Sequence, residues 1–210
     1  GKVPNKEIVK AFDVSLILYA EHSFNVSTFT ARTITSSLSD IHGAITGAIA
    51  SLKGPLHGGA NEEVMHMMKK IKKPENALKW INKALDNKDV VMGFGHRVYK
   101  SGDSRVPTMR EYFKKVSFVK KDKIFEKIYD IVEKVMIKRK NIHPNVDYPT
   151  GPTYHLMGFD TDFFTPIFVI SRITGWSAHI MEQHAANKLI RPLASYNGNK
   201  HRKVLQLNQR

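Results

Sequence analysis

The chain has 210 residues, 41% of them hydrophobic and 25% charged, which suffices to bury a core in one large domain or two small ones. It has no cysteine and no apolar run long enough to cross a bilayer, which excludes a disulfide framework, a thiolate metal site and a membrane-spanning helix. Its net charge of +14 is spread over many segments without an RRM, KH or zinc-finger signature, so a small phosphorylated ligand explains the charge better than a nucleic acid does.

The first quarter of the chain predicts three helices. Apolar residues recur at helical spacing over Glu7–Glu21, and a buried helix rich in Thr and Ser is expected over Ser27–Leu38. Asp40 is placed to cap a third helix, Ile41–Leu52. Two glycines four residues apart lie on one face of that third helix and allow another helix to approach closely.

A histidine, His57, lies between a Gly-Pro turn and a Gly-Gly pair, just before the start of a helix. We expect Asn61 to cap that helix, with Glu62 and Glu63 in its first turn. An imidazole at a helix N-terminus is kept neutral and can donate a hydrogen bond to developing negative charge. The alternative is an incidental histidine in a loop.

The middle of the chain predicts four further helices, at about Glu62–Ile71, Pro74–Asn87, Pro107–Phe118 and Asp122–Arg139. The segment Val90–Lys100 interrupts them with a G-x-G-H turn followed by basic residues. This turn lacks a third glycine and a βαβ context, so it does not indicate a Rossmann fold.

The last third begins with a loop at Asn141–Pro149, which contains two prolines. Helices are expected over Gly151–Met157 and Phe163–Gly175, with Gly175 as a break before a further helix, Trp176–Leu189. The basic tail, Asn197–Arg210, is expected to be an extended arm. The fold class is therefore predicted to be all-α, with at most a short hairpin.

Three side chains in Gly- or Pro-rich loops between helices are candidates for catalysis: His57, His96 and Asp147. Four more suit the binding of anions: His22, Arg105, Arg172 and Arg191. Arg172 is the most informative, because an unpaired arginine inside an apolar helix is costly and needs a partner or a ligand. Ion pairing with Asp160, Asp162 or Glu182 is the structural alternative.

Two other kinds of site are not supported. His179 and His184 are five residues apart, which is not the spacing that places two metal ligands on one helix face, so no metal site is expected. The G-x-S-x-G turn of a serine hydrolase is absent from the sequence.

Together these segments resemble the citrate synthase family. The matching motifs, which occur in family order between Phe12 and Tyr196, are AEHSFNVSTFTAR, KGPLHGGANEEVM, VMGFGHRVYKSGDSR, HPNVDY, FFTPIFVISRITGWSAHIMEQ and NKLIRPLASY. The resemblance implies an all-α fold with its active site in the cleft between two domains. Residues 58–158 would form the small, mobile domain, and residues 1–57 and 159–210 part of the large domain, whose N-terminal helices are absent here.

The resemblance implies a transferase that condenses an acyl-CoA with oxaloacetate and then hydrolyses the thioester. Asp147 would be the general base that removes the α-proton. His57 would stabilise the enol or enolate, and His96 would polarise the oxaloacetate carbonyl. His22, Arg105 and Arg172 would hold the carboxylates of oxaloacetate.

The resemblance also implies partners. Arg191 would reach the site of a neighbouring subunit, so a homodimer is expected. Coenzyme A would enter as the thioester co-substrate, with no tightly bound cofactor, no metal, no nucleic acid and no membrane. Its adenine and phosphates would meet the basic run at Lys138–Arg139–Lys140 and a backbone segment; the residues expected to bind it are Val91, Met92, Gly93, Phe94, Gly95, Lys138 and Lys140.

The subtype is indicated by three short segments. Gly102–Pro107 reads GDSRVP where many citrate synthases have Asp-Pro-Arg, and Asp147–Pro149 and Gly158–Asp160 also look more like the 2-methylcitrate synthase branch. That branch uses propionyl-CoA, in propionate catabolism, and a citrate synthase of the tricarboxylic acid cycle is the alternative. A truncated, non-catalytic basic binding module and a citrate-cleaving relative are the other hypotheses. The expected location is the cytoplasm, or the mitochondrial matrix in a eukaryote.

Overall fold

A computed structural model of the chain describes residues 3–99, 101–200 and 202–210. Over these residues the predicted all-α class is confirmed: the structure is helical, and its one strand-like feature is an isolated antiparallel bridge between Phe94 and Pro144. The elements are α1 (Lys6–Tyr19), α2 (Val26–Ser36), α3 (Ile41–Leu52), α4 (Ala60–Ile71), α5 (Pro74–Asp86), α6 (Val106–Lys120), α7 (Ile124–Lys140), α8 (Asp147–Met157) and α9 (Phe164–Ala185), with short 3₁₀ turns η1 (Thr161–Phe163) and η2 (Leu207–Gln209).

Side-chain caps begin the first three helices. The side chains of Asn5, Asn25 and Asp40 each accept a hydrogen bond from a backbone N–H of the following first turn. The expected cap at Asp40 is therefore confirmed. Pro74 and Pro107 each lie in the first turn of a helix, where a missing N–H leaves no intrahelical bond unmade.

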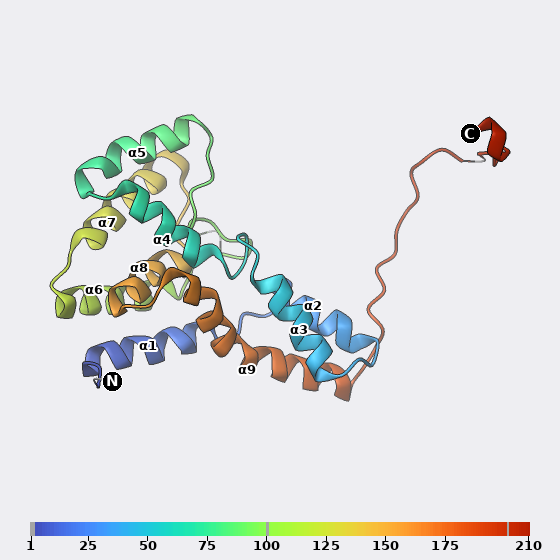
Figure 1. The fold of residues 1–210 in the computed structure, drawn as a ribbon, viewed down its shortest axis with the longest axis horizontal. Coiled ribbons are helices and arrows are strands. Elements are labelled where there is room, and N and C mark those ends of the chain that lie inside the picture. The colour runs from blue at the N-terminus through green and yellow to red at the C-terminus, as the bar shows by residue number, and fades with distance from the viewer. Residues whose placement is uncertain (1–2, 100, 201) are drawn as a thin grey trace.

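The helices enclose two hydrophobic cores. One lies among α1, α4 to α8 and the beginning of α9, and the other lies mainly among α2, α3 and α9, with Tyr19 of α1 and Met109 of α6 packed into it. Figure 1 shows α9 running from the first group of helices to the second, after which the chain extends away from the body. The C-terminal tail is thus the extended arm expected from the sequence. None of the helices in the described residues is long and apolar enough to cross a membrane.

Two glycines allow close contacts between helices. A Cβ at Gly47 would lie 2.2 Å from Cδ1 of Ile34, so α3 approaches α2 as closely as the sequence predicts. A Cβ at Gly175 would lie 2.4 Å from the carbonyl oxygen of Ala20. The predicted break at Gly175 is wrong, because this glycine makes room for the end of α1 against an α9 that is continuous from Phe164 to Ala185.

Two more helix starts differ from the prediction. Asn61 is not a cap: the chain folds back on the end of α3, with the N–H of Gly58 donating to the carbonyl of Leu52, and enters α4 at Ala60. Asn61 is then fully buried in the first turn. Helix α8 begins four residues before the predicted position, so Asp147 lies in its first turn and not in a loop. Pro149 is tolerated there because the first turn needs no N–H from it.

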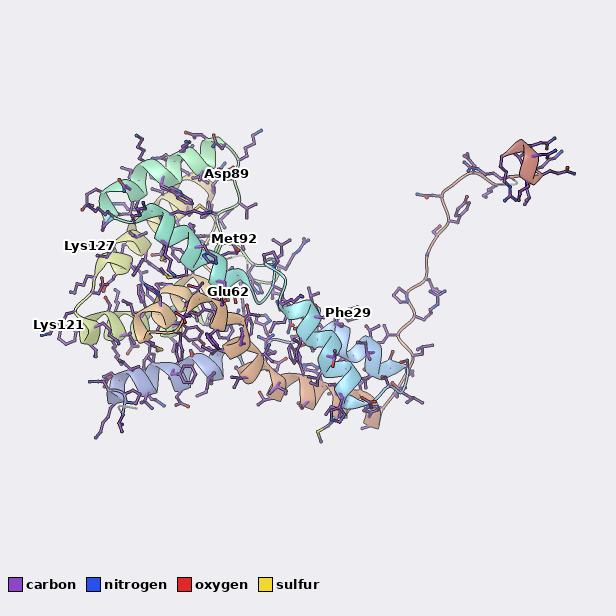
Figure 2. All side chains as sticks on the ribbon, viewed as in Figure 1. Phe29, Glu62, Asp89, Met92, Lys121 and Lys127 are labelled. Atoms are coloured by element: carbon purple, nitrogen blue, oxygen red, sulfur yellow. The ribbon has the colours of Figure 1, made fainter. Side chains whose placement is uncertain are left out.

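The expected division into residues 58–158 and the remainder stays a prediction. Helices from both parts are connected directly: α1 packs against α6 as well as α9, and Oε1 of Glu62 in α4 accepts a hydrogen bond from the N–H of Thr165 at 3.0 Å. Figure 2 labels Glu62 at this junction, in the middle of the molecule.

Candidate active site

A cavity of about 620 Å³ lies where the end of α1 and the beginnings of α2, α4, α6 and α8 meet α9. Six of the seven predicted catalytic and carboxylate-binding residues line it: His22, His57, His96, Arg105, Asp147 and Arg172. Arg191 does not. It is exposed on the C-terminal segment, and its guanidinium donates to the neighbouring carbonyl of Pro192, at 3.4 Å.

Two hydrogen bonds fix Asp147, one through its carboxylate and one through its backbone. The hydroxyl of Tyr19 donates to Oδ1 at 2.5 Å, and the Asp147 N–H donates to Oδ1 of Asn145 at 3.1 Å. Burial raises the pKa of Asp147 to about 6, although the hydrogen bond from Tyr19 and the charge of Arg105 oppose the rise. A carboxylate with this pKa is ionised at neutral pH and is a stronger base than an exposed aspartate.

The imidazole of His57 is fixed by Ser27. The N–H of Ser27 donates to Nε2 of His57 at 3.3 Å, and the Ser27 hydroxyl lies 2.8 Å from the same nitrogen. Because Nε2 accepts, the proton of the neutral ring belongs on Nδ1. Burial, Arg172 and His22 lower the pKa of His57 to about 4. His57 is therefore a neutral hydrogen-bond donor at physiological pH, as the sequence predicts.

Three rings lie together at another wall of the cavity, of which His22 and His96 line it. The ring centroids of His22 and His96 are 5.0 Å apart, and Tyr99 lies 5.4 and 4.8 Å from them. Nδ1 of His96 accepts hydrogen bonds from the N–H groups of Val98 and Tyr99, at 3.1 and 3.3 Å, so in the neutral ring the proton is on Nε2. Nε2 of His22 is buried without a hydrogen-bond partner in the described part of the chain, and burial lowers the pKa of this ring.

The two arginines in the cavity differ in their partners. Arg105 is paired with Asp103. Arg172 donates through Nε to the carbonyl of Tyr19 at 2.6 Å, and its Nη1 is buried without a hydrogen-bond partner among the described residues. Burial and the nearby charge of Arg105 lower the pKa of Arg172 to about 10. A buried guanidinium nitrogen of this kind is suited to an anionic ligand.

The alternative of an ion pair for Arg172 is not supported within the described residues. Glu182 instead pairs with Arg32, whose Nε also donates to Nδ1 of His179 at 2.8 Å. His179 contacts Glu21 through its other nitrogen, at 3.0 Å. This network joins α2 and α9 to the end of α1, and it shows that His179 serves the scaffold and does not line the cavity.

Of the residues expected to bind coenzyme A, the backbone segment reaches the cavity at its end. Gly95 lines the cavity, and the segment Val91–Gly95 is joined to the loop before α8 by hydrogen bonds from Gly95 N–H to His143 and from Asn145 N–H to Gly93, at 2.8 and 2.9 Å. A Cβ at Gly93 would lie 2.9 Å from Cβ of Tyr148, so only glycine allows this approach.

The basic run at the end of α7 is divided in the structure. Lys138 and Lys140 are exposed. Arg139 instead donates to Oδ1 of Asn82 at 2.8 Å and pairs with Asp86 at 2.7 Å, both on α5. The two lysines are thus available to an anion, whereas the arginine is engaged in the scaffold.

Sequence reasoning missed several residues that shape the cavity. Tyr19 and Phe168 resemble ordinary core positions of apolar helices, although their rings lie 4.0 Å apart beside Arg172 and line the cavity. Ser27 and Asn145 act through hydrogen bonds between distant segments, which no local pattern reveals. Asp103 is the exception. It lies two residues before Arg105, and an acidic side chain so close to an arginine in the sequence could have indicated the ion pair.

The chain matches the family described as citrate synthase, C-terminal domain, over residues 1–193. It is 58% identical over 206 residues to 2-methylcitrate synthase 2 of Corynebacterium glutamicum, covering 98% of this chain and 54% of that protein. It is 45% identical over 210 residues to citrate synthase 2 of Bacillus subtilis, covering 100% of this chain and 56% of that protein.

Among solved structures, the chain superposes on citrate synthase of Thermoplasma acidophilum in ternary complex with carboxymethyl coenzyme A and oxaloacetate. The TM-score is 0.91 at 39% identity, and the match covers 100% of this chain and 57% of that one. The chain thus spans about half the length of these relatives. The family match and these identities show that the chain belongs to the citrate synthase family.

Proposed function

We propose that this region carries the condensation site of an enzyme that joins an acyl-CoA to oxaloacetate and hydrolyses the resulting thioester. The observation that supports this most directly is the convergence of an aspartate of raised pKa, a neutral histidine donor and two arginines on one cavity. The structural relative from Thermoplasma acidophilum holds a coenzyme A derivative and oxaloacetate.

Proton abstraction is assigned to Asp147 and His57. The α-proton of a thioester is too weakly acidic for a carboxylate alone, so the enolate oxygen has to be stabilised while it forms. The N–H at Nδ1 of His57 supplies that hydrogen bond, and Asp147 receives the proton. Tyr19 holds the carboxylate by the hydrogen bond described above, and Asn145 holds the backbone N–H of the same residue.

Carbon–carbon bond formation is assigned to the opposite wall of the cavity. His96 donates from Nε2 to the ketone oxygen of oxaloacetate, which becomes an alkoxide when the enolate attacks the carbonyl carbon. The guanidinium groups of Arg105 and Arg172 and the unpartnered Nε2 of His22 are suited to the two carboxylates. Closure of the predicted small domain would exclude water until this bond has formed.

For the acyl group we propose propionyl-CoA, with 2-methylcitrate as the product, because the relative from Corynebacterium glutamicum is named a 2-methylcitrate synthase. Condensation of acetyl-CoA to citrate is the second candidate, favoured by the similarity to citrate synthase 2 of Bacillus subtilis. The two products correspond to roles in propionate catabolism and in the tricarboxylic acid cycle. A cytoplasmic location stays a prediction.

We also propose a homodimer in which Arg191 serves the neighbouring site, since it is exposed on a segment that leaves the body of the molecule (Figure 1). The proposal can be tested by mixing inactive Arg191→Ala and Asp147→Ala subunits. Each mixed dimer would contain one site with an intact Asp147 and an intact partner arginine, so activity should return. Failure of mixing to restore any activity, with mixed dimers formed, would contradict the shared site.

The function is tested by thiol release from propionyl-CoA and acetyl-CoA with oxaloacetate, using the complete polypeptide that contains this region. Asp147→Ala should abolish release while leaving oxaloacetate binding, measured by calorimetry, within about threefold of the parent. No release with either thioester would refute the proposed reaction, and the ratio of kcat/KM values identifies the acyl group. Salt-sensitive binding of nucleic acid without a thermal shift from oxaloacetate would favour the non-catalytic alternative.

A further inference from the structure

The carboxylate of Asp103 is completely buried between the beginnings of α6 and α8. Its Oδ1 accepts hydrogen bonds from the N–H and the Nε of Arg105, both at 3.0 Å. Its Oδ2 accepts from Nη2 of Arg105 at 2.8 Å and from the N–H of Val146 at 3.1 Å. These four hydrogen bonds are thus donated by two residues that line the cavity, Arg105 and Val146.

The first consequence concerns the orientation of Arg105. A guanidinium presents two edges on which two parallel N–H bonds can meet a carboxylate. Asp103 occupies the edge formed by Nε and Nη2. Arg105 lines the cavity, and a carboxylate of a bound substrate would therefore use the remaining edge, formed by Nη1 and Nη2.

The second consequence concerns the base. Val146 directly precedes Asp147 and is the N-cap residue of α8. By holding the N–H of Val146, Asp103 fixes the point at which this helix begins. One buried side chain therefore connects the carboxylate-binding arginine to the backbone that carries the general base, although 43 residues separate Asp103 from Val146.

The third consequence concerns charge. Arg105 and Arg172 share the cavity, and the positive charge of Arg105 disfavours that of Arg172. A buried carboxylate beside Arg105 compensates one of these charges while the cavity is empty. Arg105 is thereby kept ordered and charged before a substrate arrives, so less ordering has to accompany binding.

We propose that Asp103 is a positioning residue of the condensation site: its carboxylate fixes Arg105 with the Nη1–Nη2 edge toward oxaloacetate, and it fixes the backbone in front of Asp147. This inference rests on the proposed function. It predicts that the loss of Asp103 acts through Arg105 on oxaloacetate and leaves the affinity for the acyl-CoA nearly unchanged.

The test is Asp103→Asn in the complete polypeptide, with thiol release measured against both substrates. We expect the KM for oxaloacetate to rise by about tenfold or more, as for the loss of a hydrogen bond to a charged group, and that for acyl-CoA to change less than about twofold. The acid limb of kcat against pH should also move to lower pH, because the charge of Asp103 contributes to the raised pKa of Asp147. An unchanged KM for oxaloacetate, or equal rises in both KM values, would overturn the proposal.

A double-mutant cycle with Arg105→Gln separates positioning from general damage. If Asp103 acts through Arg105, Asp103→Asn should add little to the oxaloacetate KM of Arg105→Gln, whereas additive losses would contradict that route. The matched control is Asp130→Asn, which removes an aspartate of α7 that pairs with Arg110 of α6 at 2.7 Å but is half-exposed outside the cavity. Its two KM values should stay within about twofold of the parent.

Two further measurements keep the test decisive. If Asp103→Asn is insoluble, Asp103→Glu retains the charge but displaces the carboxylate by one methylene, and it should also raise the oxaloacetate KM; a parental value would overturn the proposal. If the parent enzyme releases no thiol, the proposed function fails, and calorimetry of oxaloacetate still compares parent with Asp103→Asn. Equal affinities there would refute the positioning role independently.

Discussion

The hydroxyl of Tyr19, the last residue of α1, donates a 2.5 Å hydrogen bond to Oδ1 of Asp147, the first residue of α8. Burial and the neighbouring carboxylate raise the pKa of Tyr19 well above its ordinary value, so the phenol is protonated and donates at neutral pH. This contact stabilises the ionised form of Asp147 against the effect of burial.

We therefore expect Tyr19→Phe to raise the pKa of Asp147 further above about 6. Because the proposed base acts when ionised, activity should fall as pH drops through this pKa, and the acid limb of kcat should shift to higher pH in the variant. The loss of rate should be larger at pH 6 than at pH 8. A pH profile of thiol release measures the shift, and an unchanged acid limb would show that Tyr19 does not tune the base.

Tyr148→Phe is a matched control, because Tyr148 is adjacent to Asp147 but its hydroxyl donates to the carbonyl of Tyr129, at 3.2 Å, away from the carboxylate. Its acid limb should coincide with that of the parent. A shift of the same size in both variants would point to a general change in packing around α8.

Much of the fold follows from local signals in the sequence. Apolar spacing and caps predicted the helices around Asp40 and Pro74 to within a few residues, because those signals lie within the helix or next to it. The errors at Asp147 and Gly175 have a common cause: a contact with a distant segment decides where a helix begins or continues, as with Asp103 against the N–H of Val146 and Gly175 against the carbonyl of Ala20. The error at Asn61 is local, because the turn that folds back on Leu52 places the start of α4 at Ala60.

The candidate site shows the same division between local signals and distant contacts. Motifs identified His57, His96 and Asp147 because their residue types and spacing are specific to the family, and the cavity brings them together. The residues that tune them were not found, since Tyr19 and Ser27 act across more than a hundred and about thirty positions of sequence, respectively. The role of Arg191 in a neighbouring subunit stays a prediction.

The low pKa of His57 makes stability depend on pH. The pKa is about 4 in the folded chain and 6.5 for an ordinary histidine, so the unfolded state binds the proton more tightly. The folded state should lose up to about 3 kcal/mol of stability as pH falls from 6.5 to 4, and His57 should cause no loss above pH 7.

Urea unfolding at pH 7 and pH 4.5 should therefore show a smaller loss for His57→Gln than for the parent. The same substitution at His42, which is exposed on α3 outside the cavity, is the matched control. An equal loss in His57→Gln and the parent would contradict the assignment.

Gly175→Ala tests the contact that joins α1 to α9. The new Cβ would lie 2.4 Å from a backbone oxygen that cannot move without displacing Tyr19 and the residues after it. We expect a loss of about 1–3 kcal/mol in the free energy of unfolding, measured by urea titration, together with a rise in the KM for oxaloacetate. Gly43→Ala is the control: its Cβ would meet two side-chain atoms, the hydroxyl of Ser39 at 2.9 Å and Oδ1 of Asp40 at 3.7 Å, and alanine favours a helix by up to about 1 kcal/mol. That variant should be as stable as the parent or slightly more so, and equal destabilisation of both would contradict the argument.

The divided basic run at the end of α7 gives a prediction for coenzyme A. Lys138 and Lys140 are exposed beside the loop that leads to Asp147, whereas Arg139 is paired with Asp86. Replacing either lysine by alanine should raise the KM for the acyl-CoA by about three- to tenfold, as expected for one exposed charge near a phosphate, without changing that for oxaloacetate. The effect should shrink at high salt because the interaction is screened.

The control is Arg139→Ala, which should instead lower the melting temperature slightly and leave both KM values near those of the parent. Weaker acyl-CoA binding by Arg139→Ala, with normal binding by both lysine variants, would show that the acyl-CoA approaches α7 from the side of α5. The proposed path for coenzyme A would then be wrong.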